Sequence, residues 1–156
     1  MSIDAIAEST ADPMSEGQIR ELLESEGVGT LGLPGDDLPY LLPISFGYDG
    51  DATLYFVFLL FGSESRKETL ANEAERGRFL VYRARSLYDW QSVSMTGRIE
   101  VVDEGEWSEL RGAMENAWHP NIFSAAHPTR GVEGYRFEIE EWTGIQQRDP
   151  GNSSGN

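Results

Sequence analysis

The part of the chain best suited to chemistry is a short polar turn that contains Ser63, Ser65, Arg66 and Lys67. Ser65 followed three residues later by Glu68 is the pattern of a capping box, which predicts that a helix begins at this turn. The first turn of a helix offers free backbone N–H groups and the positive end of the helix dipole, so it attracts anions. Arg can hold a phosphate through two parallel hydrogen bonds, and Lys adds a compact charge. The turn therefore predicts a phosphate site, with an ordinary helix cap and two solvated cations as the alternative.

The charge of the whole chain makes this cluster unusual. Twenty-seven acidic residues outnumber twelve basic ones, which gives a net charge of −15, and Lys67 is the only lysine. A surface this acidic repels the phosphates of nucleic acids, so we expect no nucleic-acid partner. Acidic residues spread along the chain, with Arg in place of Lys, also predict a halophilic surface, because salt screens self-repulsion. The alternative is an acidic protein without adaptation to salt.

The other candidates for chemistry are weaker. His119 and His127 lack the i, i+4 spacing of a helical metal pair, so we expect solvated loop histidines, with a haem ligand or proton donor as the alternative. The chain has no Cys, which excludes disulfides and thiolate chemistry. The segment from Gly27 to Gly32 satisfies G-x-G-x-x-G. A helix is expected before it and Pro34 follows it, whereas the dinucleotide fingerprint requires a strand before and a helix after. We therefore reject a dinucleotide-binding motif at this segment. Because the histidine spacing does not suit a metal pair, we also predict no metal site.

Length and composition predict one globular domain. The chain has 156 residues, of which 39% are hydrophobic, which is enough to bury a core. It has no apolar run long enough to span a membrane and no recognisable signal peptide, so we expect a cytoplasmic protein without a membrane segment. We expect a flexible N-terminus over residues 1–13, a folded domain over residues 14–148 and a disordered tail over residues 149–156.

Three helices are expected. Ser15 and Gln18 form a capping box for the first, and Gly27 ends it. Two more are expected over about residues 65–76 and about residues 104–117.

Strands dominate the rest of the pattern. We expect them over residues 28–33, 40–48, 53–58, 78–85, 91–102 and 135–145. The first three follow one another without a helix, and the dipeptide at residues 49–50 is typical of a tight hairpin turn. This order predicts a mainly β fold, a small antiparallel barrel with peripheral α-helices, rather than a parallel βαβ sheet.

Several short segments, taken in order, carry a family resemblance. They are Gly29-Thr30-Leu31, the run from Pro39 to Phe46, Leu54-Tyr55-Phe56, Ser65-Arg66-Lys67 at a helix start, the run from Trp90 to Arg98, and Trp142-Thr143-Gly144. In this order the chain resembles the pyridoxamine 5'-phosphate oxidase-like, FMN-binding split-barrel family, as an acidic, haloarchaeal-type member. The resemblance extends from about Ser15 to Arg148, and the Ser-Arg-Lys segment is its most specific piece.

The resemblance implies a split β-barrel that binds FMN, usually as a homodimer with two flavins at the interface. By position, Ser65, Arg66 and Lys67 would hold the FMN phosphate, with Ser63 nearby. The resemblance thus assigns the predicted phosphate site a specific ligand, FMN.

The resemblance also implies where the rest of the flavin would lie. Leu42, Pro43, Ile44 and Ser45 would follow the edge of the isoalloxazine ring and offer it backbone groups. The ribityl chain would lie near Val57 and Phe58. Gln91 and Ser92 would contact the flavin, and Trp142 would reach it from the partner subunit.

The chain departs from the oxidases of this family at the substrate end. The strand 41–46 lacks the Arg and Lys that those enzymes carry, and their C-terminal Arg-x-His is reduced to Arg148 and Asp149. We therefore expect an FMN-dependent oxidoreductase of unknown small-molecule substrate, and we assign no catalytic acid or base. The alternatives are a non-enzymatic FMN carrier or sensor, and a haem- or deazaflavin-binding member of the same barrel.

Overall fold

The computed structural model describes residues 11–59, 75–114 and 132–148. Its elements in chain order are β1 (Asp12–Pro13), α2 (Glu16–Ser25), β2 (Val28–Leu33), β3 (Tyr40–Tyr48), β4 (Thr53–Leu59), β5 (Arg76–Ser86), β6 (Asp89–Val101), the 3-10 turn η1 (Glu104–Glu106), α4 (Trp107–Ala113) and β7 (Val132–Gln147). No helix in these ranges is both long and apolar enough to cross a membrane.

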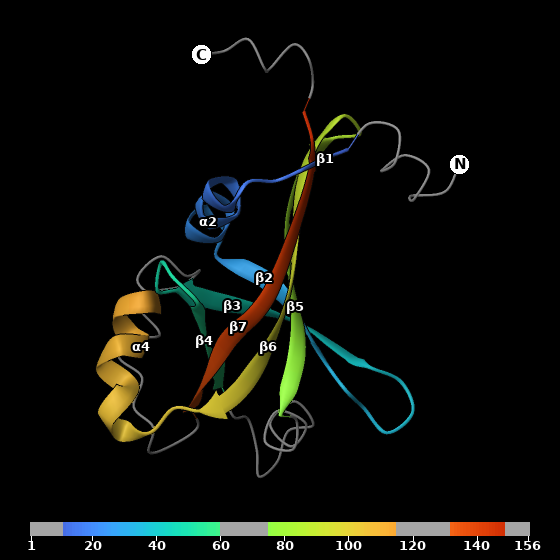
Figure 1. Ribbon diagram of the computed structural model, residues 1–156. Coiled ribbons are helices and arrows are strands. Elements are labelled where there is room, and N and C mark those ends of the chain that lie inside the picture. Colours follow the sequence, from blue (N-terminus) through green and yellow to red (C-terminus); the bar gives the residue numbers. More distant parts are fainter. Residues whose placement is uncertain (1–10, 60–74, 115–131, 149–156) are drawn as a thin grey trace.

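Six antiparallel strands close into a barrel in the order β7-β4-β3-β2-β5-β6, and β6 pairs again with β7 (Figure 1). The long β7 makes this closure possible. Its first half pairs with β4 on one edge, while its other edge pairs with β6 from Tyr135 to Gln147. The short β1 continues the first edge, because Asp12 and Pro13 lie opposite Gln146 and Ile145. This topology confirms the predicted split β-barrel with peripheral helices.

The barrel interior is filled by aromatic side chains. Phe79 of β5 lies among the rings of Phe46, Phe56 and Phe137, with ring centroids 5.3, 5.0 and 6.3 Å away. A Cβ atom at Gly29 would lie 2.5 Å from the Phe79 ring. Glycine at this position is therefore required by packing, which explains one glycine of the rejected nucleotide motif.

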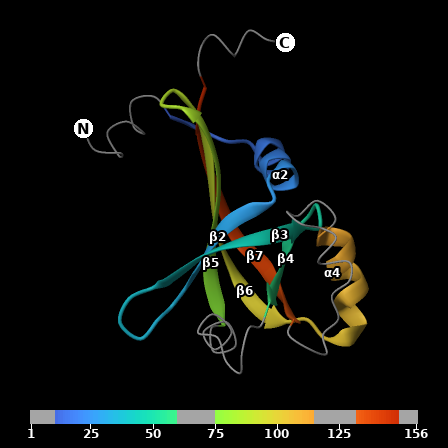
Figure 2. The ribbon, with the colours of Figure 1, turned by 180° about the vertical axis from the view of Figure 1, so that it is seen from behind.

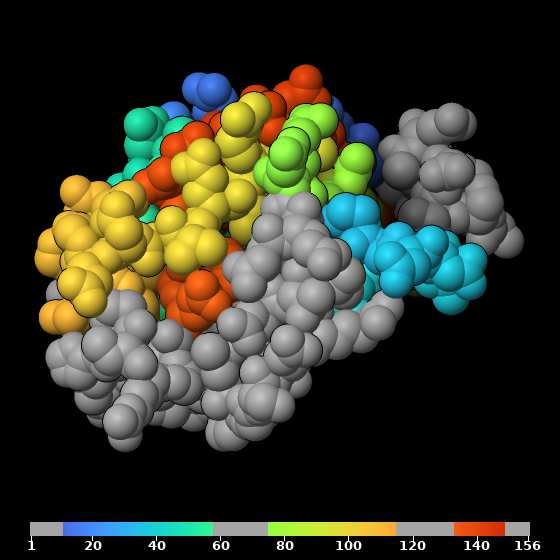
Figure 3. Space-filling view, turned by 90° about the horizontal axis from the view of Figure 1, so that it is seen from below, coloured from blue at the N-terminus to red at the C-terminus, as the bar shows by residue number. Residues whose placement is uncertain are grey.

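Two helices cover the barrel on the side opposite the β2–β3 hairpin (Figures 1 and 2). The first, α2, begins at the predicted capping box, where Ser15 N donates to Gln18 Oε1 and Gln18 N donates to Ser15 Oγ. Its buried residues Ile19, Leu22 and Leu23 join the main core. The second, α4, forms a separate apolar cluster with the outer face of β4. The β2–β3 hairpin projects from the body of the protein (Figure 3).

The sequence predicted β2 and β3 to the residue, and the other barrel strands within three residues at each end. Arg76, expected at the end of the second helix, instead begins β5, and the rest of that helix lies outside the described residues. The third helix is shorter than expected within the described part, because residues 104–106 form a 3-10 turn. The sequence did not predict β1, since two residues show no periodicity.

Candidate cofactor site at the opening between β3 and β4

The strands β3 and β4 separate over part of their length. They pair only at Phe46, Gly47 and Tyr48, whereas β4 continues along β7 as far as Leu59. Over residues 40–45, β3 is paired with β2 alone. The barrel therefore has an opening between the first part of β3 and the last part of β4.

Backbone groups of β3 face this opening. Phe46 N donates to Gly27 O across the β2 side, at 3.0 Å, and Asp49 N donates to Thr53 O across the β4 side, at 3.1 Å. Because hydrogen-bonding direction alternates along a strand, Leu41, Pro43 and Ser45 direct their backbone groups away from β2, toward the opening. Among the described strands none pairs with Leu41 or Pro43 there, whereas the pairing of Phe46 with Phe56 engages the Ser45 carbonyl. The edge offers two N–H donors, of Leu41 and Ser45, and two carbonyl acceptors, of Leu41 and Pro43, since Pro43 has no N–H.

The side chains of the predicted ring contacts divide between two faces. Leu42 and Ile44 point inward and pack against the main core, while Pro43 and Ser45 lie on the outer face of the barrel. The backbone N–H and C=O groups of Leu42 and Ile44 point toward β2, so neither their side chains nor these groups are directed to the opening. Of these four residues, only Pro43 and Ser45 direct backbone groups toward the opening, and the predicted flavin contacts stay a prediction.

The predicted contacts on β4 and beyond are described only in part. Val57 is buried in the cluster formed with Trp107, Leu110 and Met114, so its side chain faces α4. Phe58 belongs to β4, and its side chain lies outside the described residues. The same holds for the predicted phosphate turn, Ser63, Ser65, Arg66 and Lys67, and for His119 and His127.

Gln91 and Ser92 lie in a different part of the barrel. Both are in β6, which β5 and β2 separate from β3. With a strand spacing of about 4.8 Å, Ser92 is roughly 14 Å from β3 across the sheet. The free edge of β3 also faces away from β2. One chain therefore does not bring the β3 edge and the Gln91–Ser92 pair together.

Trp142 lies beneath α2. It packs against the main core, and the Arg20 guanidinium of α2 is 5.5 Å from its ring centroid. Arg20 also donates to Gly50 O at 2.9 Å, so it links α2, β7 and the β3–β4 turn. The described residues thus give Trp142 a contact with α2, and they do not bring it to the β3 edge.

A polar pocket of about 240 Å³ lies where α2 meets the end of the β5–β6 hairpin. Three arginines line it together with Trp90 and Gln91. Arg83 is paired with Glu26 at 2.7 Å, and Arg85 is 4.0 Å from Asp89. Arg148 has no ion pair within the described residues. The sequence did not single out this cluster, because its members come from three distant segments.

A shallow hollow of about 270 Å³ lies next to this pocket on the outer face of β5 and β6. Leu80, Tyr82, Ala84 and Ser92 line it, and Gln91 borders both the hollow and the polar pocket. Tyr82 is 60% exposed. The hollow therefore joins an exposed apolar surface to the position of Gln91.

Comparisons with known proteins place the chain in a family. The family model described as pyridoxamine 5'-phosphate oxidase matches residues 15–146. No curated protein matches the chain.

Among solved structures, a FAD-binding protein from Mesorhizobium loti is 22% identical, with a TM-score of 0.67 over 87% of this chain and 97% of that one. The FAD and heme binding protein from Mycobacterium smegmatis is 17% identical, with a TM-score of 0.66 over 95% and 81%. The FAD binding protein from the same organism is 20% identical, with a TM-score of 0.64 over 88% and 99%. These likenesses support the fold, and the family match covers most of the chain. The chain therefore belongs to the pyridoxamine 5'-phosphate oxidase family.

Proposed function

We propose that this protein is a flavin-binding oxidoreductase that acts on a small molecule and holds FMN at the opening between β3 and β4. The observation that carries the proposal is the backbone edge of Leu41 and Pro43, with the Ser45 N–H beside it, which no described strand pairs in a chain of this family. A flavin ring has donors and acceptors along one edge and apolar faces. A free strand edge beside an apolar core meets both requirements.

The residues present fit the ring end of such a cofactor. The β3 edge supplies N–H and C=O groups in alternation, and Leu42 and Ile44 fix this strand to the core from its inner face. When bound, the flavin supplies the redox chemistry, and the protein supplies binding and orientation. For the phosphate end we propose Ser65, Arg66 and Lys67, with Ser63 nearby. The turn follows the end of β4 in the sequence.

A homodimer is part of the proposal, because the site is incomplete in one chain. The β3 edge and the Gln91–Ser92 pair lie on separate parts of the barrel, so a second copy has to supply one of the two sets.

The outer face of the sheet is suited to this contact. One row across five strands consists of Pro43, Thr30, Leu80, Ser94 and Thr143, and none is charged. In a chain with 25% charged residues, an uncharged row of this length favours burial against a partner.

The proposal does not name a substrate. The family's substrate-binding basic residues are missing from β3, so we do not propose oxidation of pyridoxamine phosphate. FAD, which extends FMN by an adenosine monophosphate group, is the alternative flavin, since similar structures are of FAD-binding proteins. FMN is our proposal because the basic turn is suited to a single terminal phosphate.

The first test is the absorption spectrum of the purified protein, followed by titration with FMN, FAD and riboflavin. We expect a flavin spectrum and tighter binding of FMN than of riboflavin. A Soret band would instead identify a haem protein. A colourless protein that binds none of the three flavins would overturn the proposal.

The second test removes the two basic side chains of the proposed phosphate site. The double variant R66A/K67A should bind FMN about 100-fold more weakly, because it loses two charge-assisted contacts. Its affinity for riboflavin, which has no phosphate, should not change. The matched control is R76A/R98A, which removes two exposed positive charges from β5 and β6. Equal losses in both double variants would show a general charge effect and would contradict the assigned phosphate site.

A further inference from the structure

Three glutamines from distant parts of the sequence form a continuous hydrogen-bonded relay. Gln91 Nε2 donates to Gln146 Oε1 at 3.1 Å, and Gln146 Nε2 donates to Gln18 Oε1 at 3.0 Å. Gln18 Oε1 also accepts from the backbone N–H of Ser15 at 2.9 Å. The relay thus runs from the N-terminus of α2 through β7 to β6. Gln146, its central member, is 8% exposed.

The start of the relay determines the direction of every later bond. A backbone N–H can only donate, so the Gln18 atom that meets Ser15 N must be the oxygen. The Gln146 atom that meets this oxygen must then be its NH₂ group, which leaves the Gln146 oxygen to face Gln91. Gln91 in turn must donate through its own NH₂ group. The capping box of α2 therefore sets the orientation of the Gln91 amide in β6.

The relay leaves Gln91 with one free polar atom. Its NH₂ group is committed to Gln146, and its oxygen has no hydrogen bond within the described residues. An isolated glutamine amide could rotate and offer either a donor or an acceptor. Here the relay fixes the amide: Nε2 keeps one N–H beside its bond to Gln146, and the carbonyl oxygen is the atom without a bond, at a residue that borders both the polar pocket and the outer hollow.

We propose that Gln18 and Gln146 are positioning residues that hold Gln91 as a hydrogen-bond acceptor for an N–H or O–H group of the bound flavin. The inference rests on the proposed flavin site, and it adds the direction of one contact and the residues that impose it. Gln91 accepts from a ring N–H or from a ribityl hydroxyl. Gln18 and Gln146 act through Gln91 and do not touch the ligand.

The test compares flavin affinity in Q146M, Q91M and the double variant Q91M/Q146M. Methionine has a similar length and removes the amide. Each single variant should bind FMN about fivefold more weakly, which corresponds to one lost neutral hydrogen bond. The double variant should bind no more weakly than Q91M, because Gln146 acts only through Gln91. Lumiflavin, which has the ring but no ribityl chain, distinguishes the two donors: a fivefold loss for lumiflavin assigns the ring N–H, and no loss assigns the hydroxyl.

The matched control is the pair Q18E and Q18M. Glutamate keeps an oxygen that accepts from Ser15 N and from Gln146, so Q18E should bind FMN like the wild type. Methionine removes this oxygen, so Q18M should weaken binding as Q146M does. Thermal unfolding without flavin checks that each variant is folded.

The outcomes separate this inference from the proposed function. A wild-type protein that binds no flavin overturns both. A wild type that binds flavin, together with Q146M of unchanged affinity, overturns the inference alone. A further loss in Q91M/Q146M beyond that of Q91M would show that Gln146 supports the fold in general, and it would also overturn the positioning role.

Discussion

The two helices that cover the barrel, α2 and α4, are held by different kinds of polar contact. Beneath α2, the neutral amides of Gln18, Gln91 and Gln146 form the relay, and they carry no net charge. Beside α4, a single guanidinium, that of Arg136 in β7, faces three carboxylates. Both helices also bury apolar residues, and α2 has the ion pairs of Arg20 with Asp51 and of Glu26 with Arg83. The difference therefore lies in the two networks and not in every contact of the helices.

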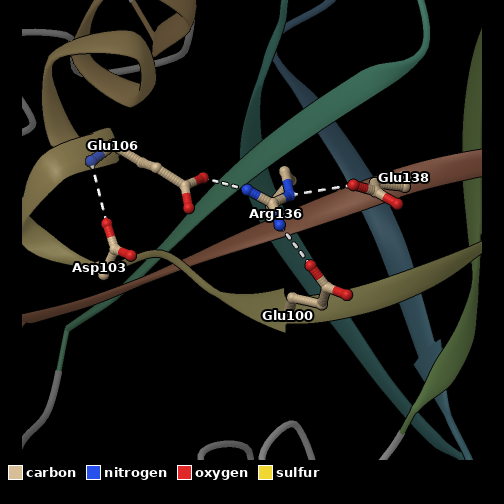
Figure 4. A network of polar contacts seen from close by, with 5 residues as sticks. All are labelled: Glu100, Asp103, Glu106, Arg136 and Glu138. Atoms are coloured by element: carbon tan, nitrogen blue, oxygen red, sulfur yellow. Dashed lines mark hydrogen bonds and ion pairs between the residues drawn. The ribbon is translucent and has the colours of Figure 1, made fainter.

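The ionic network joins three elements around one side chain (Figure 4). Arg136 donates to Glu100 of β6 and to Glu106 of η1, and its Nε lies 3.2 Å from Glu138. Asp103 Oδ1 accepts from Glu106 N and caps the 3-10 turn. Burial alone would lower the pKa of Arg136, but the hydrogen bonds to Glu100 and Glu106 outweigh it and raise the pKa.

The difference in charge predicts how salt affects the stability of each network. Three carboxylates around one guanidinium leave excess negative charge near α4, and dissolved salt screens the repulsion among them. The amide relay has no net charge to screen. We therefore expect the Arg136 network beside α4 to depend on salt and the amide relay beneath α2 to be nearly independent of it. This expectation fits the predicted halophilic surface, which stays a prediction.

The largest expected effect comes from adding one methyl group under each helix. A Cβ at Gly47 would lie 2.3 Å from Ala113 O, a backbone atom of α4, whereas a Cβ at Gly144 would meet the side chains of Met14 and Ile19 at 2.8–2.9 Å. Side chains can move more easily than a helix backbone. We expect G47A to lower the free energy of unfolding by about 3 kcal/mol and G144A by about 1 kcal/mol. Urea denaturation measures both, and a larger loss in G144A would contradict the comparison.

A smaller effect distinguishes the two polar networks. R136M leaves three carboxylates without their partner, and we expect a loss of about 2 kcal/mol in low salt, because Arg136 is mostly buried at 21% exposure. The loss should shrink in 1 M NaCl, where the screening length is about 3 Å. Q146M should cost about 1 kcal/mol at either salt concentration, since its hydrogen bonds are neutral. Unfolding curves at both salt concentrations give the salt dependence of the stability loss in R136M and in Q146M. The same salt dependence in both variants would contradict the comparison.

The smallest effect concerns alkaline pH on the α2 side. Burial raises the pKa of Tyr48 from 10.0 to about 12, and its hydroxyl donates to Asp51 O at 2.7 Å. Both states keep the proton below pH 10. Between pH 10 and about 12 the unfolded chain ionises first, so stability falls as the pH rises.

Replacement of Tyr48 tests this fall directly. Y48F should lose stability less steeply than the wild type between pH 9 and pH 11, and the difference should be small because Tyr48 is only partly buried. Y82F, which changes an exposed tyrosine on the outer face, serves as the control. Parallel curves for Y48F and the wild type would remove Tyr48 as the cause. Burial also raises the pKa of Tyr55 near α4, so part of the fall should persist in Y48F.

Local patterns explain why so much of the fold could be predicted from the sequence. The capping box of Ser15 and Gln18 involves residues three apart, and the alternation in β2 and β3 repeats every two residues. Such signals lie within one element, so periodicity and turn residues suffice to read them. The end of the helix expected over residues 65–76 was wrong at Arg76, because an Arg has no strong preference between a helix end and the first residue of an exposed strand.

The residues of the candidate site could be named from the sequence, but their arrangement in space could not. The sequence named Leu42 to Ser45 and Gln91, but it could not show that β3 pairs with β4 only from Phe46 onward, which depends on the register of two strands. It also could not show that β2 and β5 separate the two groups of contacts. The arginine pocket was missed for the same reason, since Arg83 and Arg148 become neighbours only when the barrel closes.

The sequence by itself determined the class of the molecule: an acidic, cysteine-free β-barrel with a capped first helix and one basic turn that contains the only lysine. These features depend on composition and on spacings of a few residues. Only the tertiary structure decided which backbone edge of β3 the described strands leave unpaired and which atom of Gln91 bonds to Gln146. Hydrogen bonds between Gln18, Gln91 and Gln146 join residues up to 128 positions apart, so their direction exists only once the barrel has closed.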